Sequence, residues 1–160
     1  SDASKEHDYH RNSDCFVCAI LTHGEKQDVL YGTDGKADFK NILSFFKGKE
    51  CPGLVGKPKL FFIQACQGNK VDQGVTFDVA DSKAVMPREK RKIPIEADIL
   101  RAHSSVTGYS AWRHETQGSW YIQALTEMLN KNWQKMDLLT MLTRVNQMVA
   151  LQMTETFKMQ

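Results

Sequence analysis

One stretch, Lys59-Leu60-Phe61-Phe62-Ile63-Gln64-Ala65-Cys66-Gln67-Gly68, holds an unbroken apolar run that leads into a polar turn. A run with apolar residues at both odd and even positions is typical of a strand that is buried on both faces of a parallel sheet. Reactive groups in such sheets gather just beyond the carboxyl ends of the strands, where Cys66 stands. The stretch thus predicts a displayed nucleophile, with an inert buried cysteine as the alternative, since free cysteines are among the most buried residues.

A second apolar run, residues 15–21, predicts another buried strand, and it ends in the turn Thr22-His23-Gly24-Glu25. Between the two runs, a helix that is capped by Asp38 and ends near Gly48 is predicted, because the apolar residues from Phe39 to Phe46 recur at helical spacing. A strand, a helix and a strand in this order form a right-handed crossover with parallel strands. We therefore expect the histidine of the turn and Cys66 at the same edge of one sheet.

The rest of the chain predicts one more strand and two helices. The strand covers residues 97–102 and is followed by a loop over residues 104–118. The helices cover residues 120–129 and 138–149, with apolar residues on one side of each, and Asp137 caps the second. Together with the crossover, this order predicts an α/β fold with a mostly parallel sheet.

The composition favours one globular domain, because 160 residues with 41% hydrophobic and 25% charged content supply both a core and an ordinary surface. No apolar run approaches the roughly 20 residues that span a bilayer. The net charge of +2 argues against a broad nucleic-acid surface, and the basic run at residues 88–92 is best explained as part of a solvated linker. Four cysteines without an export signal predict a reducing, cytoplasmic location. Because the chain does not begin with methionine, a processed product or a fragment is expected.

A cysteine nucleophile needs a base, because a free thiol with a pKa of about 8.5 is only slightly ionised at neutral pH. His23 is the best-placed histidine for that role, and the alternative is a turn histidine that hydrogen-bonds its own loop. Gly24 adds a backbone amide that can approach a ligand closely and help to hold an oxyanion. The remaining histidines lie in the polar amino-terminal stretch, at the end of a different strand or in a loop: His7, His10, His103 and His114.

A zinc module is a competing interpretation for the amino-terminal part. His7, His10, Cys15 and Cys18 form a His-x-x-His and a Cys-x-x-Cys pair at metal-ligand spacing. In a strand with a period of two, however, Cys15 and Cys18 fall on opposite faces. We therefore predict no metal site and no cofactor.

Several motifs together resemble the caspase family, and within it the executioner group most. Gln64-Ala65-Cys66-Gln67-Gly68 matches the caspase nucleophile signature, and Thr22-His23-Gly24-Glu25 resembles the caspase histidine motif. Residues 108–113 and 118–120 resemble the substrate-binding loop of the small subunit, and Ile93-Pro94-Ile95-Glu96-Ala97-Asp98 resembles the opening of that subunit. The resemblance implies a caspase-like three-layer sandwich, in which helices cover both faces of a mostly parallel sheet.

The resemblance also implies how the chain is divided. Residues 1–81 correspond to the later part of the large catalytic subunit, residues 68–93 to the intersubunit linker, and residues 94–160 to part of the small subunit. The family's upstream pocket arginine and its C-terminal pairing strand fall outside this span. A central portion, truncated at both ends, is therefore expected.

The predicted linker carries a processing signal. Asp78-Val79-Ala80-Asp81 has the Asp-x-x-Asp form that such enzymes favour, and Ser82 follows it. We predict cleavage after Asp81, with Asp72 as a weaker site. The length of the linker fits this interpretation, since long loops inside compact domains are commonly functional or processed.

The family pattern assigns chemistry to the matched residues. It implies that Cys66 attacks the scissile carbonyl, that His23 acts as acid and base, and that the backbone amides of Gly24 and Cys66 stabilise the oxyanion. Gln64 and Arg113 match the pocket that reads an aspartate carboxylate, a role that suits a bidentate guanidinium. From residue type alone, a solvated loop charge is the simpler explanation of Arg113.

The substrate-binding loop supplies further candidates. Trp112 and Trp120 match aromatic walls for the residues before the aspartate, with core packing as the alternative for both. Ala111 belongs to the same loop. Ser110 stands where executioner caspases usually carry an aromatic residue, and His114 stands where asparagine is usual, so the preference two and four residues before the cut stays open.

The implied function is that of a cysteine endopeptidase that cleaves proteins after aspartate in apoptosis and is made as a zymogen activated by linker cleavage. The implied partners are protein substrates, a second large/small-subunit unit in a dimer, an upstream initiator caspase and inhibitor-of-apoptosis proteins; neither nucleic acid nor membrane is expected. A catalytically silent caspase-like regulator or decoy is the alternative. The absent pocket arginine and pairing strand favour that alternative, whereas the retained His23, Cys66, Gln64 and Arg113 oppose it.

Overall fold

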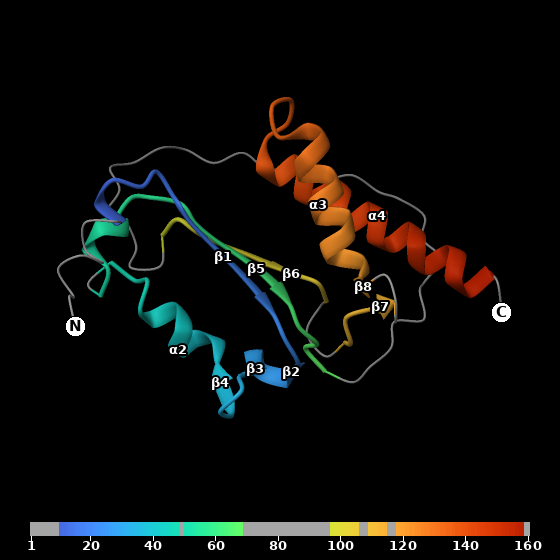
Figure 1. The fold of residues 1–160 in the computed structure, drawn as a ribbon, viewed down its shortest axis with the longest axis horizontal. Coiled ribbons are helices and arrows are strands. Elements are labelled where there is room, and N and C mark those ends of the chain that lie inside the picture. Colours follow the sequence, from blue (N-terminus) through green and yellow to red (C-terminus); the bar gives the residue numbers. More distant parts are fainter. Residues whose placement is uncertain (1–9, 49, 69–96, 106–108, 115–117, 159–160) are drawn as a thin grey trace, which may run out of the picture.

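The central sheet is built from three parallel strands (Figure 1). The computed structural model describes residues 10–48, 50–68, 97–105, 109–114 and 118–158. Among these residues, β5 (Lys59–Gln64) lies between β1 (Phe16–Leu21) and β6 (Ile99–His103). The predicted parallel pairing of the first two apolar runs is thus confirmed, and Leu21 of β1 stands in register with Gln64 of β5.

A small antiparallel sheet and a short helix fill the connection from β1 to β5. The sheet consists of β2 (Gly24–Glu25), β3 (Val29–Tyr31) and β4 (Lys36–Asp38), and α2 (Phe39–Ser44) follows at once. The Lys40 N–H donates to Asp38 Oδ1 over 2.8 Å, which confirms the predicted cap. The helix ends at Ser44, before the predicted end near Gly48, because the next two residues continue in tighter i to i−3 turns.

Helices cover both faces of β5. Figure 1 shows α2 on one side of the sheet and, on the other side, α3 (Trp120–Asn132) and α4 (Leu138–Lys158). The side chains of β5 alternate accordingly: Phe61 and Ile63 pack in a cluster with residues of α2, whereas Phe62 packs in a cluster with residues of α3 and α4. This arrangement is the three-layer α/β sandwich that the sequence predicts.

The prediction that β1 is buried on both faces is wrong. Phe16, Cys18 and Ile20 pack on the α2 side, but Val17 and Leu21 are 55% and 61% exposed. The reason is the position of β1 at the edge of the described sheet, where α3 and α4 pack over β5 and β6 instead. An unbroken apolar run does not by itself distinguish an edge strand from a central one.

The first residue of β5 is a buried lysine. Lys59 is only 4% exposed, and its Nζ donates to the carbonyl oxygens of Leu54 and Lys57, each over 2.9 Å. Both acceptors belong to the connection before β5, which contains the 3₁₀ turn η2 (Pro52–Leu54). The ammonium group thus ties this connection to the strand that leads to Cys66.

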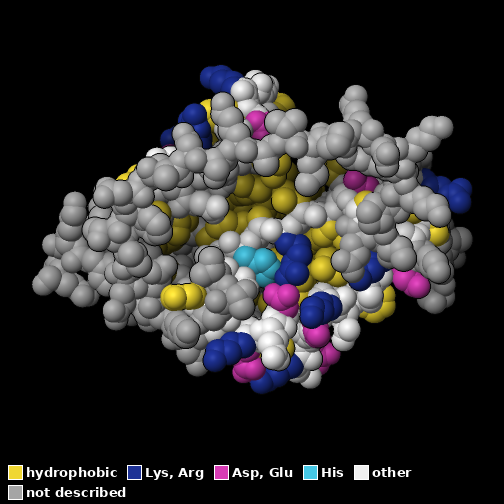
Figure 2. All heavy atoms as spheres, turned by 180° about the vertical axis from the view of Figure 1, so that it is seen from behind, with side chains coloured by type: hydrophobic (Ala, Val, Ile, Leu, Met, Phe, Trp, Pro, Cys, Tyr) yellow, Lys and Arg dark blue, Asp and Glu magenta, His cyan; other side chains and the backbone are white. Residues whose placement is uncertain are grey.

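The two closing helices begin where they are predicted, but they continue past the predicted residues 129 and 149 to Asn132 and Lys158. Asp137 Oδ1 accepts the Thr140 N–H over 2.9 Å at the start of α4. No helix in the described ranges is both long and apolar enough to cross a membrane. Seen from behind, apolar side chains gather in a hollow, and many basic and acidic side chains lie below it (Figure 2).

The predicted loop over residues 104–118 contains two strands that were not predicted. β7 (Arg113–His114) and β8 (Gly118–Ser119) pair antiparallel, with Arg113 opposite Ser119. Each strand has two residues, which is too short to show a period in the sequence. Apart from Gly68, the predicted linker, including Asp72, Asp78 and Asp81, lies outside the described residues.

Candidate active site

Cys66 follows the carboxyl end of β5 and is held by the segment that follows β6. Ser105 Oγ donates to the Ala65 carbonyl oxygen over 3.2 Å, and the Gln67 N–H donates to the Tyr109 carbonyl oxygen over 2.9 Å. The buried side chain of Gln67 donates in turn to the Ser105 carbonyl oxygen over 2.7 Å. The backbone on both sides of Cys66 is therefore fixed, while Cys66 itself stays partly exposed.

His23 follows the carboxyl end of the neighbouring strand β1. The N–H of Thr22 donates to the Gln64 carbonyl oxygen over 3.0 Å, which extends the β1–β5 ladder by one residue. On the other side, the Tyr31 N–H donates to the His23 carbonyl oxygen over 3.0 Å, and Thr22 Oγ1 donates to the Tyr31 carbonyl oxygen. The backbone of His23 is thus held between β5 and β3.

At Gly24, the turn that contains His23 packs against the turn that contains Cys66. A Cβ atom at Gly24 would lie 2.3 Å from the carbonyl oxygen of Cys66 and 3.0 Å from Cβ of Ala65. Real Cβ atoms do not approach a backbone oxygen so closely, so this contact requires glycine. The predicted catalytic residues Cys66, His23 and Gly24 therefore come from two turns that pack directly on each other.

One cavity of about 760 Å³ joins these turns. Its lining includes four residues predicted from the sequence, namely His23, Gln64, Cys66 and Ala111. Residues from β8 and α3 complete the wall, among them Ser119 and Gln123. The structure thus brings a thiol, an imidazole and a carboxamide to one hollow at the carboxyl edge of the sheet.

The segment before β7 contacts the cysteine itself. The Ala111 N–H donates to Cys66 Sγ over 3.4 Å, and Ser110 Oγ donates to the Gly68 carbonyl oxygen over 3.2 Å. This part of the predicted substrate-binding loop therefore lies across the cysteine turn.

Ser119 is a cavity residue that the sequence analysis missed. Its hydroxyl donates to Gln64 Oε1, and it also accepts the Ile122 N–H over 3.2 Å as the N-cap of α3. A serine directly before an amphipathic helix is an ordinary N-cap signal, so the cap could have been found from the sequence. Its contact with Gln64 could not, because the two residues are far apart in the chain.

The two predicted tryptophans stack on each other. The ring centroids of Trp112 and Trp120 are 5.3 Å apart and their planes differ by 9°. Such a pair forms a flat aromatic surface beside β7 and β8. The side chains of Arg113 and His114 lie outside the described residues, although their backbone forms β7.

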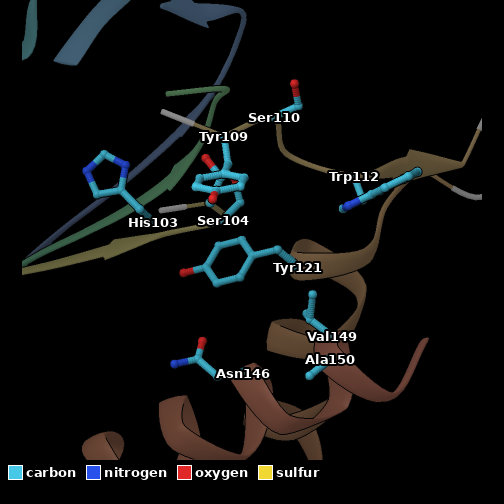
Figure 3. A pocket seen from close by; sticks show the side chains of 10 residues that line it. His103, Ser104, Tyr109, Ser110, Trp112, Tyr121, Asn146, Val149 and Ala150 are labelled. Carbon is cyan, nitrogen blue, oxygen red and sulfur yellow. The ribbon is translucent and has the colours of Figure 1, made fainter. Parts of the chain in front are cut away.

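A second cavity, of about 420 Å³, is lined by some of the predicted substrate-binding residues but not by Cys66. Ser110 and Trp112 line it together with Tyr109, whereas Ala111 lines the cavity of Cys66. Figure 3 shows the tyrosine rings of this second cavity between the segment after β6 and α4, with Asn146, Val149 and Ala150 on the α4 side. The predicted substrate loop is thus divided between two hollows.

An ion pair links the segment between β2 and β3 to β6. Arg101 donates to Asp28 Oδ2 over 2.8 Å, and its guanidinium lies 4.7 Å from the ring centroid of Phe39. The same guanidinium contacts Nε2 of His103 over 3.1 Å. Nδ1 of His103 is buried without a hydrogen-bond partner in the described part of the chain. Burial, helped by the charge of Arg101 and opposed by that of Asp28, lowers the pKa of His103.

The described residues hold no group of three or more histidine, cysteine, aspartate or glutamate side chains placed to bind a metal ion. Of the residues in the zinc interpretation, Cys15 precedes β1 and is exposed, whereas Cys18 lies within β1. His7 lies outside the described residues. The two cysteines are therefore differently placed relative to the sheet.

Comparisons with known proteins agree on one family. A family model described as "Caspase domain" matches residues 2–160. Caspase-3 of Bos taurus is 46% identical over 152 residues, which are 95% of this chain and 53% of that protein. Caspase-7 of Gallus gallus is 42% identical over 144 residues, which are 88% of this chain and 46% of that protein. The chain thus spans about half the length of the curated relatives it matches.

A solved structure has the same fold. The crystal structure of Caspase-1 from Spodoptera frugiperda superposes with a TM-score of 0.75 at 39% sequence identity. The match covers 95% of this chain and 59% of that one. The α/β sandwich described above is therefore shared with a solved relative.

Proposed function

The chain belongs to the caspase family and resembles its executioner group, and from this premise we propose that it is the central part of a cysteine endopeptidase that cleaves proteins after aspartate. One observation carries the proposal: His23, Cys66 and Gln64 share one cavity at the carboxyl edge of the sheet. A thiol, a base and a polar recognition group are the minimum that such chemistry needs.

In the proposed reaction, His23 removes the proton of the Cys66 thiol, and the thiolate attacks the scissile carbonyl carbon. The backbone N–H groups of Gly24 and Cys66 stabilise the oxyanion of the tetrahedral intermediate, a contribution of about 3–4 kcal/mol per donor in comparable enzymes. The intermediate collapses to a thioester as His23 protonates the leaving amine. Water, deprotonated by His23, then hydrolyses the thioester and restores the thiol.

The proposed specificity comes from donors that face the aspartate carboxylate. Gln64 lines the cavity of Cys66, and its amide N–H groups suit a carboxylate, which only accepts hydrogen bonds. Arg113 supplies a guanidinium from β7, whose backbone is paired with β8 beside the cavity. The stacked Trp112 and Trp120 offer apolar surface to the residues that precede the aspartate.

We further propose that the protein acts in apoptosis in the cytoplasm, as a zymogen that is activated by cleavage after Asp81 in the linker. Its proposed partners are a second copy of the large/small-subunit unit, an upstream initiator caspase and inhibitor-of-apoptosis proteins. These assignments rest on the family and on the Asp78-Val79-Ala80-Asp81 motif.

Turnover of a peptide tests the proposal. The purified protein, with its dimeric state checked, is mixed with an acidic tetrapeptide amide that ends in aspartate and with the same peptide ending in asparagine. The proposal expects hydrolysis of the aspartate peptide alone, and loss of that hydrolysis in Cys66→Ala. A dimeric protein that neither cleaves the peptide nor reacts at Cys66 with a peptide electrophile contradicts the proposal and favours a silent caspase-like regulator.

A further inference from the structure

We propose that Arg101 is a positioning residue for the turn that contains His23, and that it acts through its ion pair with Asp28. The inference deepens the proposed function and rests on it for the role of His23 as acid and base. Arg101 lies in β6 of the central sheet, whereas Asp28 directly precedes β3 of the small antiparallel sheet. The ion pair therefore joins the two sheets, and neither of its residues lines the cavity of Cys66.

The guanidinium of Arg101 is held on three sides. It donates to Asp28 Oδ2 over 2.8 Å, and its carbon atom lies 4.7 Å from the centroid of the fully buried Phe39 ring. It also contacts His103 Nε2 over 3.1 Å. Because an arginine side chain has no acceptor, Nε2 accepts this bond and the imidazole is neutral. The side chains of the ion pair are only 32% and 20% exposed, so the pair is better fixed than an ordinary surface pair.

The turn that ends at Asp28 has an unfavourable backbone. Gln27 and Asp28 have φ angles of 65° and 63°, in the left-handed region that residues other than glycine seldom adopt. Two such residues in succession persist only where the surrounding contacts hold the backbone in place. The bond from Arg101 supplies a contact of this kind at the Asp28 carboxylate. We therefore expect the turn to relax when the ion pair is removed.

The strand β3 connects Asp28 to the turn that contains His23. It begins directly after Asp28 and pairs with β2, where Leu30 stands opposite Gly24. At the end of β3, the Tyr31 N–H donates to the His23 carbonyl oxygen over 3.0 Å. A shift of Asp28 thus moves the strand that holds the backbone of the proposed base.

Two conservative substitutions remove the ion pair and keep the shape of the side chains. Arg101→Met keeps the apolar stem beside Phe39 and removes the guanidinium. Asp28→Asn removes the charge, and asparagine also tolerates the left-handed region. Lys36→Met is the matched control, because the ion pair of Lys36 with Glu25 joins β4 to β2 within the small sheet and does not reach the central sheet.

The first readout is steady-state hydrolysis of the aspartate peptide, with active sites counted by titration with a peptide electrophile. Arg101→Met and Asp28→Asn should each lower kcat roughly three- to tenfold and change KM less than about twofold, because the base moves while the cavity wall around Gln64 stays. The double variant should lose about as much as either single variant, since both remove one contact. Additive losses, unchanged kcat in the single variants, or an equal loss in Lys36→Met overturns the inference.

The second readout needs no turnover. The imidazole of His23 gives a ring ¹H–¹³C signal in NMR spectra that is assigned by its disappearance in His23→Gln. Arg101→Met and Asp28→Asn should shift this signal in the same direction, and Lys36→Met should leave it near its original position. If the wild-type protein cleaves no peptide, the proposed function fails, whereas an unchanged His23 signal in both Arg101→Met and Asp28→Asn is what overturns the role of Arg101.

Discussion

Gly24 and the carbonyl oxygen of Cys66 are so close that a single added carbon atom would collide: a Cβ at residue 24 would lie 2.3 Å from that oxygen. The contact joins the turn after β1 to the turn after β5. Because the atom that a Cβ would strike is a backbone oxygen and not part of a flexible side chain, one of the two turns would have to move to remove the clash. The spacing of the proposed nucleophile and base therefore depends on the absence of a side chain at residue 24.

Gly24→Ala should lower kcat/KM at least about 100-fold, because displacement of the turn moves both His23 and a proposed oxyanion donor. The measurement is steady-state hydrolysis of the aspartate peptide together with thermal unfolding. Gly48→Ala is the control, since a Cβ there would meet only Val55 Cγ2 at an ordinary 3.6 Å. Equal activity of Gly24→Ala and Gly48→Ala would show that the close contact has no catalytic consequence.

Linker processing should depend on the proposed nucleophile. We expect the mature protein to contain a cut after Asp81, and we expect Cys66→Ala, produced alone, to remain uncut at that position. Asp81→Ala should block the cut as well, whereas Cys15→Ala, which changes an exposed cysteine, should not. Intact-mass measurement of each variant identifies the cut, and a cut after Asp81 in Cys66→Ala would assign the processing to another protease.

Stability should fall with acid through His103. The pKa of His103 is lowered in the folded protein, so below the ordinary histidine pKa of about 6.5 the unfolded chain binds the proton more readily than the folded one. The free energy of unfolding should therefore decrease as the pH falls below about 6.5, toward the lowered pKa. Urea unfolding at several pH values measures this dependence. In His103→Gln the slope in that window should be smaller, and an unchanged slope would remove His103 as its source.

Lys59→Met should destabilise the protein although it keeps the apolar stem of the side chain. The substitution removes the ammonium donor from two carbonyl oxygens, those of Leu54 and Lys57, although the Leu54 oxygen still accepts the Lys57 N–H over 3.2 Å. A cost of about 1–3 kcal/mol in the free energy of unfolding is expected. Lys131→Met is the control, because Lys131 pairs with Glu127 at the exposed surface of α3 and should change stability by about 0.5 kcal/mol or less. A similar loss in both variants would argue against a special role for the buried ammonium.

Local patterns in the sequence identify the elements of this fold well. The predicted strand at residues 59–64 has the bounds of β5, and Asp38 and Asp137 cap the helices that they were predicted to cap. These features depend on neighbours along the chain, through side-chain period or a bond to the next turn. The error at β1 is of another kind, because its burial depends on which helices pack over it.

The site was predictable where a motif supplied it and not where contacts cross between elements. The motifs led to His23, Gln64 and Cys66, which the structure brings to one cavity. They did not lead to the bond between Ser119 and Gln64 or to the ion pair between Arg101 and Asp28. Neither contact produces a periodic pattern or a fixed spacing in the sequence, because each joins segments that meet only after folding.

The register between β1 and β5 fixes where His23 and Cys66 lie relative to each other along the sheet edge. Leu21 is paired with Gln64, and His23 and Cys66 each stand two residues beyond that pair. One residue inserted into either strand would displace its reactive group by about 3.3 Å and turn it to the opposite face. A residue inserted in a connection, such as the turn between β3 and β4, would leave this count unchanged.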